Sequence, residues 1–222
     1  MRTVVITGAN RGIGLELARL LDERGYRVIG VCRQSSPELN ALGVDVKAGV
    51  DVTRAEGLVD LAERLRGNRI DLLVNNAGLL RPSSLDGIES ELADWRAQFE
   101  VNSLGPVRVT SALRNHLNDG GKVVIITSRM GSIADNTSGG AYAYRMSKAA
   151  VNAAGVSLAH EFRDRGIAVG LLHPGYVKTG MTGNTGHVEA HEAAGMLVER
   201  IGELDMELSG SFRHANGEEL PW

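Results

Sequence analysis

A single cysteine, Cys32, occurs among the 222 residues. An internal disulfide and a cluster of thiolate metal ligands are therefore both excluded. The sequence also lacks any apolar run approaching the roughly 20 residues that span a bilayer, which argues against a membrane protein. Its formal net charge of -3 leaves no excess of basic residues. Nucleic acids and anionic membranes are consequently poor candidates for its main partner.

Signals for targeting and for metal binding are also missing. Only three residues precede the apolar run that begins at Val4, so we expect no signal or transit peptide and a cytoplasmic location. Of the six histidines, His187 and His191 are four residues apart, but no HExxH motif accompanies them. The surface of a helix is the better interpretation of this pair, and we predict no metal site.

Short β-branched runs alternate with longer segments of helical periodicity. We predict strands at 4–7, 26–32, 44–50, 70–74, 122–127, 167–172 and 210–213, and helices at 13–24, 55–66, 92–117, 144–165 and 189–201. The helix at 92–117 should break or bend near Gly105-Pro106. Continuous apolar strands separated by helices indicate a parallel sheet covered on both faces. The predicted fold is α/β, a doubly wound, mostly parallel sheet of Rossmann type, with one domain filling residues 1–222.

Three glycines, Gly8, Gly12 and Gly14, follow the first predicted strand. Gly8 would allow a tight turn, Gly12 close approach of a pyrophosphate, and Gly14 close packing of the next helix, whose free N–H groups would face the phosphates. Their G-x-x-x-G-x-G spacing differs from the commoner G-x-G-x-x-G, and the glycines could serve only to make a turn. Their place between a strand and a helix favours a dinucleotide site.

The end of the second predicted strand favours NADP over NAD. An NAD site usually places an acid there for the ribose 2′-OH, whereas this chain has Cys32 followed by Arg33. Arg11, inside the glycine loop, adds a second guanidinium. Each arginine alone is equally typical of a solvated surface. Together, without an acid beside them, they could hold a 2′-phosphate by charge-assisted hydrogen bonds, so we predict NADP(H).

Two more strand ends carry candidates for binding adenosine. Asp51-Val52 follows the third strand, where the carboxylate could accept from the adenine amino group or cap the next helix, with Thr53 as a competing cap. These two roles of Asp51 stay equally open. Residues 75–78, Asn-Asn-Ala-Gly, follow the fourth strand. They could let the backbone pass close to the ribose or form an ordinary turn.

Tyr144 and Lys148 lie four residues apart on a predicted helix, so both polar groups can reach one cleft. A phenol with a pKa near 10 is a poor acid–base catalyst at neutral pH, and lowering that pKa to about 7 requires on the order of 4 kcal/mol. Lys148 and a positive nicotinamide ring could together supply this energy. The spacing alone is also typical of an amphipathic helix with a snorkelling lysine.

Two further polar residues are placed where they could take part. Ser128 follows the fifth strand, at the same sheet end, and could donate a hydrogen bond to a carbonyl oxygen as charge develops on it. A turn serine is the commoner role. Asn102 lies inside the long predicted helix, where asparagine is unfavourable. It therefore indicates a polar role or a kink before Gly105-Pro106.

The ordered set of motifs resembles the short-chain dehydrogenase/reductase family over essentially the whole chain. The matching pieces are TGANRGIG at 7–14, NNAG at 75–78, Asn102, Ser128, YRMSK at 144–148 and HPGYVKTGM at 173–181. Within the family, the stretches GANRGIG, VCR, SRMGSIADN and GEELPW resemble the C-factor and Sniffer-type carbonyl reductase branch. This resemblance implies NADP-dependent reduction of a ketone or aldehyde, or the reverse reaction, by hydride transfer.

The resemblance also implies a role for each matching residue. Tyr144 would give the proton to the carbonyl oxygen, Lys148 would lower its pKa and bind the nicotinamide ribose, and Ser128 would polarise the carbonyl. Asn102 would hold a water that links Lys148 to solvent. The cofactor would contact Gly8, Asn10, Arg11, Gly12, Ile13, Gly14, Arg33, Asp51, Val52, Asn76, Ala77, Gly78, Tyr144, Lys148, Pro174, Gly175, Val177 and Thr179. A homodimer or homotetramer assembled through the helix at 147–165 is expected, with a small carbonyl compound or alcohol as substrate.

Two departures from the family pattern bear on the substrate. The segment from Ser128 to Tyr144 is longer than in most members, and its polar insert at 133–140 could edge the active site. The segment after Thr179 is short, which predicts an open or shallow pocket and weak selectivity. Pro221-Trp222 could dock on the sheet end or on a partner subunit.

Two other functions on the same fold were weighed against a reductase. The C-factor resemblance suggests a cofactor-binding signalling protein with little turnover. Loss of Tyr144 or Lys148 would favour that function, and both residues are present. An epimerase fits poorly, because such relatives are usually longer. The complete set of Asn102, Ser128, Tyr144 and Lys148 favours the reductase.

Overall fold

The structure, a computed structural model, describes residues 1–222 and contains one seven-stranded sheet with the strand order β3-β2-β1-β4-β5-β6-β7. All neighbouring strands are parallel, which confirms the predicted doubly wound sheet. The strands are β1 Thr3–Thr7, β2 Arg27–Val31, β3 Asp45–Lys47, β4 Ile70–Asn75, β5 Leu117–Ile126, β6 Ala168–His173 and β7 Phe212–His214.

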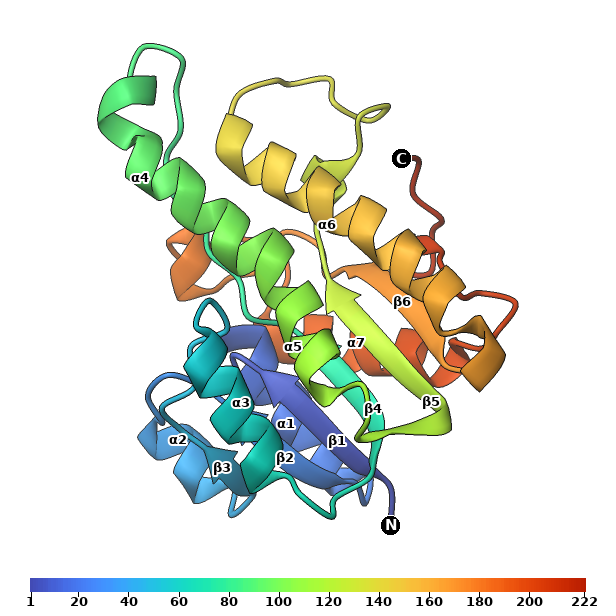
Figure 1. Cartoon of the computed structure of the whole chain (residues 1–222). Helices are drawn as coiled ribbons and strands as arrows, with labels where there is room; N and C mark the ends of the chain where they lie inside the picture. The colour runs from blue at the N-terminus through green and yellow to red at the C-terminus, as the bar shows by residue number, and fades with distance from the viewer.

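Helices cover both faces of this sheet (Figure 1). They are α1 Gly12–Glu23, α2 Pro37–Ala41, α3 Ala55–Arg64, α4 Ile88–Phe99, α5 Gly105–Leu113, α6 Tyr142–Glu161 and α7 Ala190–Glu203. Alternate strand residues enter two cores, so Val4 and Ile6 pack with α1 and α7 while Val5 packs with α3 and α5. None of the helices has both the length and the apolar content needed to cross a bilayer.

Several predicted element boundaries are wrong: the strand expected at 44–50 is Asp45–Lys47, the one expected at 210–213 is Phe212–His214, and three longer elements also differ. The helix expected at 92–117 begins at Ile88, passes through a π-helical segment, η1 Glu100–Leu104, and ends at Leu113, with Pro106 in the first turn of α5. Strand β5 begins at Leu117 instead of 122, because Leu117 is buried and pairs with Ile70 across an irregular register. Helix α6 begins at Tyr142 and ends at Glu161, followed by a 3-10 turn, Arg163–Arg165.

The short helix α2 was not predicted at all. Its start carries recognisable signals, since Ser36 accepts a hydrogen bond from the Leu39 amide at 3.1 Å and Pro37 occupies the first turn. Leu39 is the buried residue of α2. A five-residue helix leaves too little periodicity to find from the sequence.

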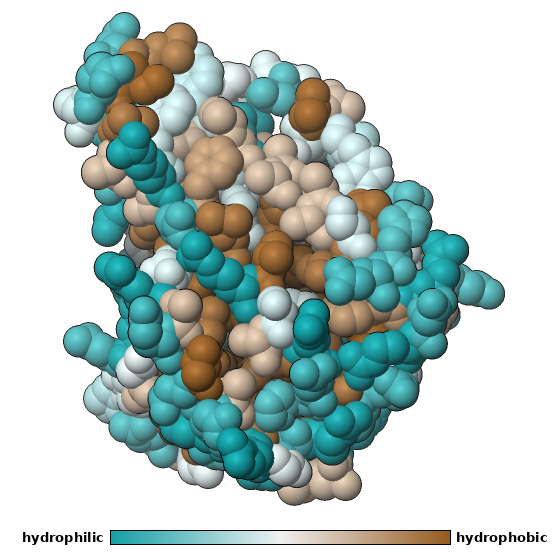
Figure 2. Space-filling view, viewed as in Figure 1, coloured by the Kyte–Doolittle hydropathy of each residue, from teal (hydrophilic) through white to brown (hydrophobic).

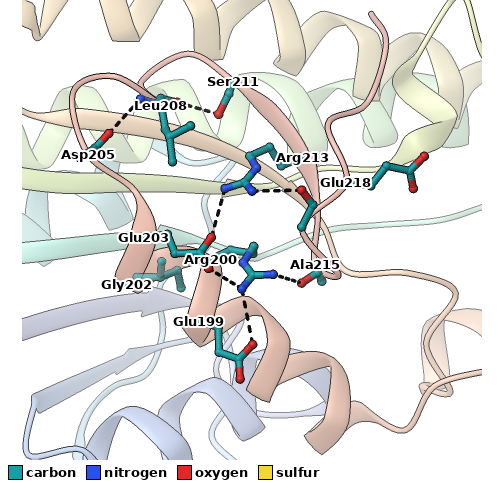
Figure 3. Close-up of polar contacts among 12 residues, drawn as sticks. Glu199, Arg200, Gly202, Glu203, Asp205, Leu208, Ser211, Arg213, Ala215 and Glu218 are labelled. Carbon is teal, nitrogen blue, oxygen red and sulfur yellow. Dashed lines mark hydrogen bonds and ion pairs between the residues drawn. The ribbon is translucent and has the colours of Figure 1, made fainter.

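Two arginines attach the last strand to α7 (Figure 3). Arg213 on β7 forms an ion pair with Glu203 at 3.2 Å, and Arg200 pairs with the same carboxylate at 2.6 Å. Arg200 also donates to the Ala215 carbonyl at 3.3 Å, and Arg213 to the Gly217 carbonyl at 3.0 Å. These contacts fix the course of the chain after β7, which leads back towards the loop that follows β5.

Candidate active site

The glycine loop joins β1 to α1 and leaves backbone donors free at the carboxyl edge of the sheet. The amides of Gly12, Ile13 and Gly14 have no acceptor in the protein, and the first turn of α1 contains no acidic residue. A Cβ on Gly14 would lie 2.3 Å from the Gly8 carbonyl oxygen, so only glycine lets the helix approach the loop this closely. Free N–H groups at a helix N-terminus form a site that suits a phosphate.

Asn76 locks the turn after β4 to the glycine loop. Its Nδ2 donates to the carbonyl oxygens of Thr7 at 3.0 Å and Gly8 at 3.2 Å. In return, Thr7 Oγ1 accepts from the amides of Asn76 and Ala77, both at 3.1 Å. The sequence predicts a cofactor contact for Asn76. Its bracing role could not be predicted, because it joins residues that are 69 positions apart.

Arg11 and Arg33 both lie exposed at the same edge, and neither has an ion-pair partner in the chain. Burial raises the pKa of Asp51, but hydrogen bonds from Thr53 and the charges of Arg33 and Arg54 outweigh it and leave that pKa lowered. Asp51 Oδ1 accepts from the Thr53 amide at 2.9 Å and from the Thr53 hydroxyl at 2.8 Å.

The helix-cap alternative for Asp51 and Thr53 is wrong. Helix α3 begins at Ala55 after an N-cap residue, Arg54, and no side chain caps it. Asp51 instead closes the turn before the helix, through its two hydrogen bonds with Thr53. Its position at the end of β3, within the electrostatic reach of Arg33, leaves the adenine role as the one still open.

Tyr144 lies in the first turn of α6, and Lys148 lies one turn further on. Lys148 is buried, its Nζ donates to the Ile126 carbonyl at 3.0 Å, and it lies 5.7 Å from the centroid of the Tyr144 ring. Burial lowers the pKa of Lys148 to about 8. Burial also raises the pKa of Tyr144 to about 12, with the hydrogen bond from Ser128 acting in the opposite direction.

These values sharpen the expectation for the tyrosine. The chain alone does not lower the phenol pKa towards neutrality, since burial outweighs the influence of Ser128. Without cofactor, Tyr144 is therefore protonated at neutral pH. A protonated phenol beside a serine hydroxyl is suited to donate a proton.

Ser128 combines the two roles that the sequence left open. It follows β5, is buried, and its Oγ accepts from the Met130 amide at 3.1 Å, which caps the 3-10 turn Arg129–Gly131. The Ser128 hydroxyl also acts to lower the pKa of the Tyr144 phenol, so the two side chains lie close together. The turn therefore holds the serine in place against the tyrosine.

Asn102 lies in η1 and is buried, and its side chain links two parts of the site. Its Oδ1 accepts from the Leu79 amide at 2.7 Å, and its Nδ2 donates to the Leu79 carbonyl at 2.7 Å and to Ser147 Oγ at 3.0 Å. Ser147 Oγ donates to the Tyr144 carbonyl at 2.8 Å. Both amide hydrogens of Asn102 are thus engaged, so the predicted water would have to be held by an oxygen of Asn102, and that role stays a prediction.

Two serines complete this bridge and were not predicted. Besides Ser147, the buried Ser103 donates to the Ser147 carbonyl at 2.7 Å. Both hydroxyls act between η1 and α6, so the only available signal was the serine inside the YRMSK motif.

The chain after β6 faces the glycine loop at the carboxyl edge of the sheet. A Cβ on Gly12 would lie 3.3 Å from Thr179 Cγ2, so Thr179 faces the glycine loop. Val177 is buried and pairs with Val188, which turns the short segment after Thr179 back on itself. The remaining predicted cofactor residues lie on these same loops at the carboxyl edge: Asn10, Val52, Gly78, Pro174 and Gly175. No group of three or more His, Cys, Asp or Glu side chains is placed to hold a metal ion.

Comparison with known sequences supports the family resemblance that the sequence motifs indicate. The model of the short chain dehydrogenase family matches residues 2–190. The chain is 41% identical over 228 aligned residues to 1-hydroxy-2-glutathionyl-2-methyl-3-butene dehydrogenase of Rhodococcus sp. (strain AD45), with 100% of both proteins covered. It is 44% identical over 155 residues to the C-signal of Myxococcus xanthus, which covers 69% of this chain and 93% of that protein.

Solved structures show the same arrangement. The carbonyl reductase Sniffer of D. melanogaster superimposes with a TM-score of 0.92 at 28% identity, and 100% of both chains is covered. An NADPH-bound carbonyl reductase from chicken fatty liver superimposes with a TM-score of 0.90 at 29% identity, covering 100% of this chain and 99% of the other. The resemblance to the C-factor and Sniffer-type carbonyl reductase branch is thereby confirmed.

Proposed function

We propose, from the premise that the chain belongs to the short-chain dehydrogenase family, that it is an NADP(H)-dependent carbonyl reductase with Tyr144 as its acid–base residue. The observation that carries this proposal is the meeting of Tyr144, Ser128 and Lys148 at the end of β5. An acid, a second hydroxyl donor and a buried amine are the groups that carbonyl reduction needs.

A bound nicotinamide cofactor would supply the hydride that the carbonyl carbon receives in the proposed reaction. Ser128 and Tyr144 donate hydrogen bonds to the carbonyl oxygen as negative charge develops on it, and the phenol transfers its proton to that oxygen. Lys148 stabilises the phenolate that remains. Because the pKa of Lys148 is about 8, the amine is mostly cationic at neutral pH and can also return a proton to the tyrosine.

The residues at the carboxyl edge fit a dinucleotide. The free amides of Gly12, Ile13 and Gly14 suit the pyrophosphate. Arg33 and Arg11 suit a 2′-phosphate, since both are exposed and have no ion-pair partner. The NADPH bound to the reductase from chicken fatty liver agrees with this assignment. The negative charge of Asp51 partly offsets the positive charge of Arg33. The proposed preference for NADP therefore depends on Arg11 as well as on Arg33.

Replacing Arg33 with alanine is expected to weaken NADPH binding about 10- to 150-fold and NADH binding less than about threefold, since a hydrogen bond to a charged group contributes about 1.5–3 kcal/mol. Titration of the protein with each cofactor measures both constants. Arg24→Ala is a matched control, because Arg24 is also exposed but lies at the far end of α1. Equal weakening of both cofactors by Arg33→Ala would contradict the 2′-phosphate role.

A panel of ketones and aldehydes, assayed by the loss of NADPH or NADH absorbance, tests the proposed activity. It includes the alcohol of a glutathione conjugate in the oxidative direction, because the name of the Rhodococcus relative contains such a compound. Turnover of panel members with NADPH is the expected result. Tight NADPH binding without turnover of any member would favour the signalling alternative that the C-signal relative suggests.

A second copy of this chain is the partner we propose for the face formed by α4, η1 and α6. Figure 2 shows apolar side chains gathered where α4 and α6 lie side by side. The exposed large apolar side chains of η1 and α6 are Leu104, Tyr142 and Met146. A homodimer or homotetramer would cover them. Sedimentation should give an oligomer at micromolar concentration, and Met146→Glu should shift it towards monomer. A wild-type monomer under these conditions would refute the assembly.

A further inference from the structure

The loop between Ser128 and Tyr144 ends in a backbone conformation that needs support. It is the long yellow segment before α6 in Figure 1. Three consecutive residues, Gly139, Gly140 and Ala141, have φ values of 63°, 65° and 46°. The left-handed region is unfavourable for Ala141, which carries a Cβ. Ala141 is also the N-cap residue of α6, and its side chain makes no cap hydrogen bond.

One side chain, that of Arg145, provides this support. Its Nε donates to the carbonyl oxygens of Gly139 and Gly140, both at 3.2 Å. Its Nη2 donates to Ser138 Oγ at 2.9 Å, and its Nη1 to the Met130 carbonyl at 3.5 Å. The planar guanidinium therefore connects the turn that precedes Tyr144 with the residues that follow Ser128.

Other contacts hold different parts of the same loop. Arg129 forms ion pairs with Asp135 at 2.6 Å and with Glu218 at 3.0 Å. The Trp222 carbonyl accepts from the Ala134 amide at 2.8 Å and from Ser132 Oγ at 3.2 Å, so Trp222 docks on this loop. These contacts fix residues 129–135 to the chain after β7 and do not reach the left-handed turn.

The first turn of α6 receives one backbone hydrogen bond from outside the loop, besides the stacking of Tyr142 on Trp95. Ser83 Oγ accepts from the Ala143 amide at 3.2 Å, in place of a cap from Ala141. Within the loop, Asn136 Oδ1 accepts from the Gly139 amide at 3.1 Å. Neither contact joins the turn to the residues after Ser128, so that connection depends on Arg145.

We propose that Arg145 is a positioning residue, which sets the place of the Tyr144 phenol relative to Ser128 by bracing residues 138–141 against Met130. This inference rests on the proposed carbonyl reduction. Loss of the brace would displace the proton donor, and a displacement of about 1 Å can cost about 100-fold in rate. Most of the proposed cofactor residues lie on the loops that follow β1, β2, β3, β4 and β6, so the affinity for the cofactor should be unaffected.

The test compares Arg145→Met, which keeps the length of the side chain but removes its donors, with Arg145→Lys and the control Arg24→Met. Arg145→Met should lower kcat about 10- to 100-fold and change the Kd of NADPH less than about twofold. Arg145→Lys should recover part of the loss, because an ammonium can still donate to some of the same carbonyls. The KM of NADPH should stay constant in all three variants.

Amide hydrogen exchange of the free protein provides a measurement that does not need activity. In Arg145→Met, exchange at residues 136–144 should rise about 10-fold while exchange elsewhere stays the same, as expected for local opening. Unchanged kcat and exchange would overturn the proposal, as would faster exchange throughout the chain with weaker NADPH binding. If the wild type reduces no carbonyl compound, the proposed function fails, and the exchange comparison still decides whether Arg145 braces the turn.

Discussion

Replacing Tyr144 with phenylalanine is expected to lower carbonyl reduction about 100- to 10,000-fold, because general acid catalysis contributes about 10²–10⁴-fold and no neighbouring group is placed to substitute for the phenol. Lys148 donates to the Ile126 carbonyl, and Ser128 is engaged by the Met130 amide. The substitution removes one oxygen and keeps the ring, so the fold and the cofactor groove should persist. The Kd of NADPH should therefore change less than about threefold.

Steady-state kinetics and an NADPH titration on the same preparation measure the two effects. Tyr142→Phe is the matched control, because Tyr142 lies two residues earlier on α6, is exposed, and stacks on Trp95 with a centroid distance of 6.1 Å. Its activity should equal that of the wild type. Retention of most activity by Tyr144→Phe would eliminate the proposed proton donor, whatever the effect on binding.

Replacing Lys148 with methionine should abolish turnover and at the same time stabilise the cofactor-free protein. Burial lowers the pKa of this lysine from 10.5 to about 8, so keeping it charged at pH 7 costs on the order of 3 kcal/mol. Methionine avoids that cost. It also leaves the Ile126 carbonyl without its donor, which destabilises the folded protein by about 1 kcal/mol or more. A net gain of about 1–2 kcal/mol raises the Tm by roughly 2–8 °C in a chain of this size.

The gain should depend on pH with a defined sign. Between pH 8 and 10.5 the unfolded lysine binds more protons than the folded one, so the wild type becomes more stable as pH rises through this window. The advantage of Lys148→Met is therefore full below pH 8 and largely gone near pH 10.5. Thermal unfolding at both ends of the window measures it.

Lys178→Met is the control for the loss of a lysine, since Lys178 is exposed and pairs with Glu189 on the surface. An exposed pair contributes about 0–1 kcal/mol, so the control should show little change. A Lys148→Met protein that is less stable than the wild type at pH 7 would contradict the proposed cost of burying the charge. Turnover by that variant would contradict the role of the amine.

Local patterns in the sequence were sufficient to predict the features that depend on a few neighbouring residues. Apolar runs located the strands, and the glycines placed the phosphate end of the sheet, because a strand followed by Gly8, Gly12 and Gly14 has few alternatives. Tyr144 and Lys148 share a cleft for an equally local reason, their spacing on one helix.

What could not be predicted depends on partners that are distant in sequence. Asn76 braces Thr7 and Gly8, and Asn102 connects Leu79 with Ser147, across separations that carry no local pattern. The π-helical segment at η1 likewise became visible only in the fold, although the unfavourable asparagine pointed to it. The pKa of Tyr144 depends on burial, which spacing alone does not reveal.

The hydrogen bonds of Asn102 join two segments with different proposed roles into one rigid unit. The turn at Leu79 belongs to the side of the groove proposed for the cofactor, and Ser147 lies between Tyr144 and Lys148 on α6. Exchanges of residues 76–79 are therefore expected to change the proposed nucleotide affinity and the proposed proton transfer together, unlike substitutions on α6.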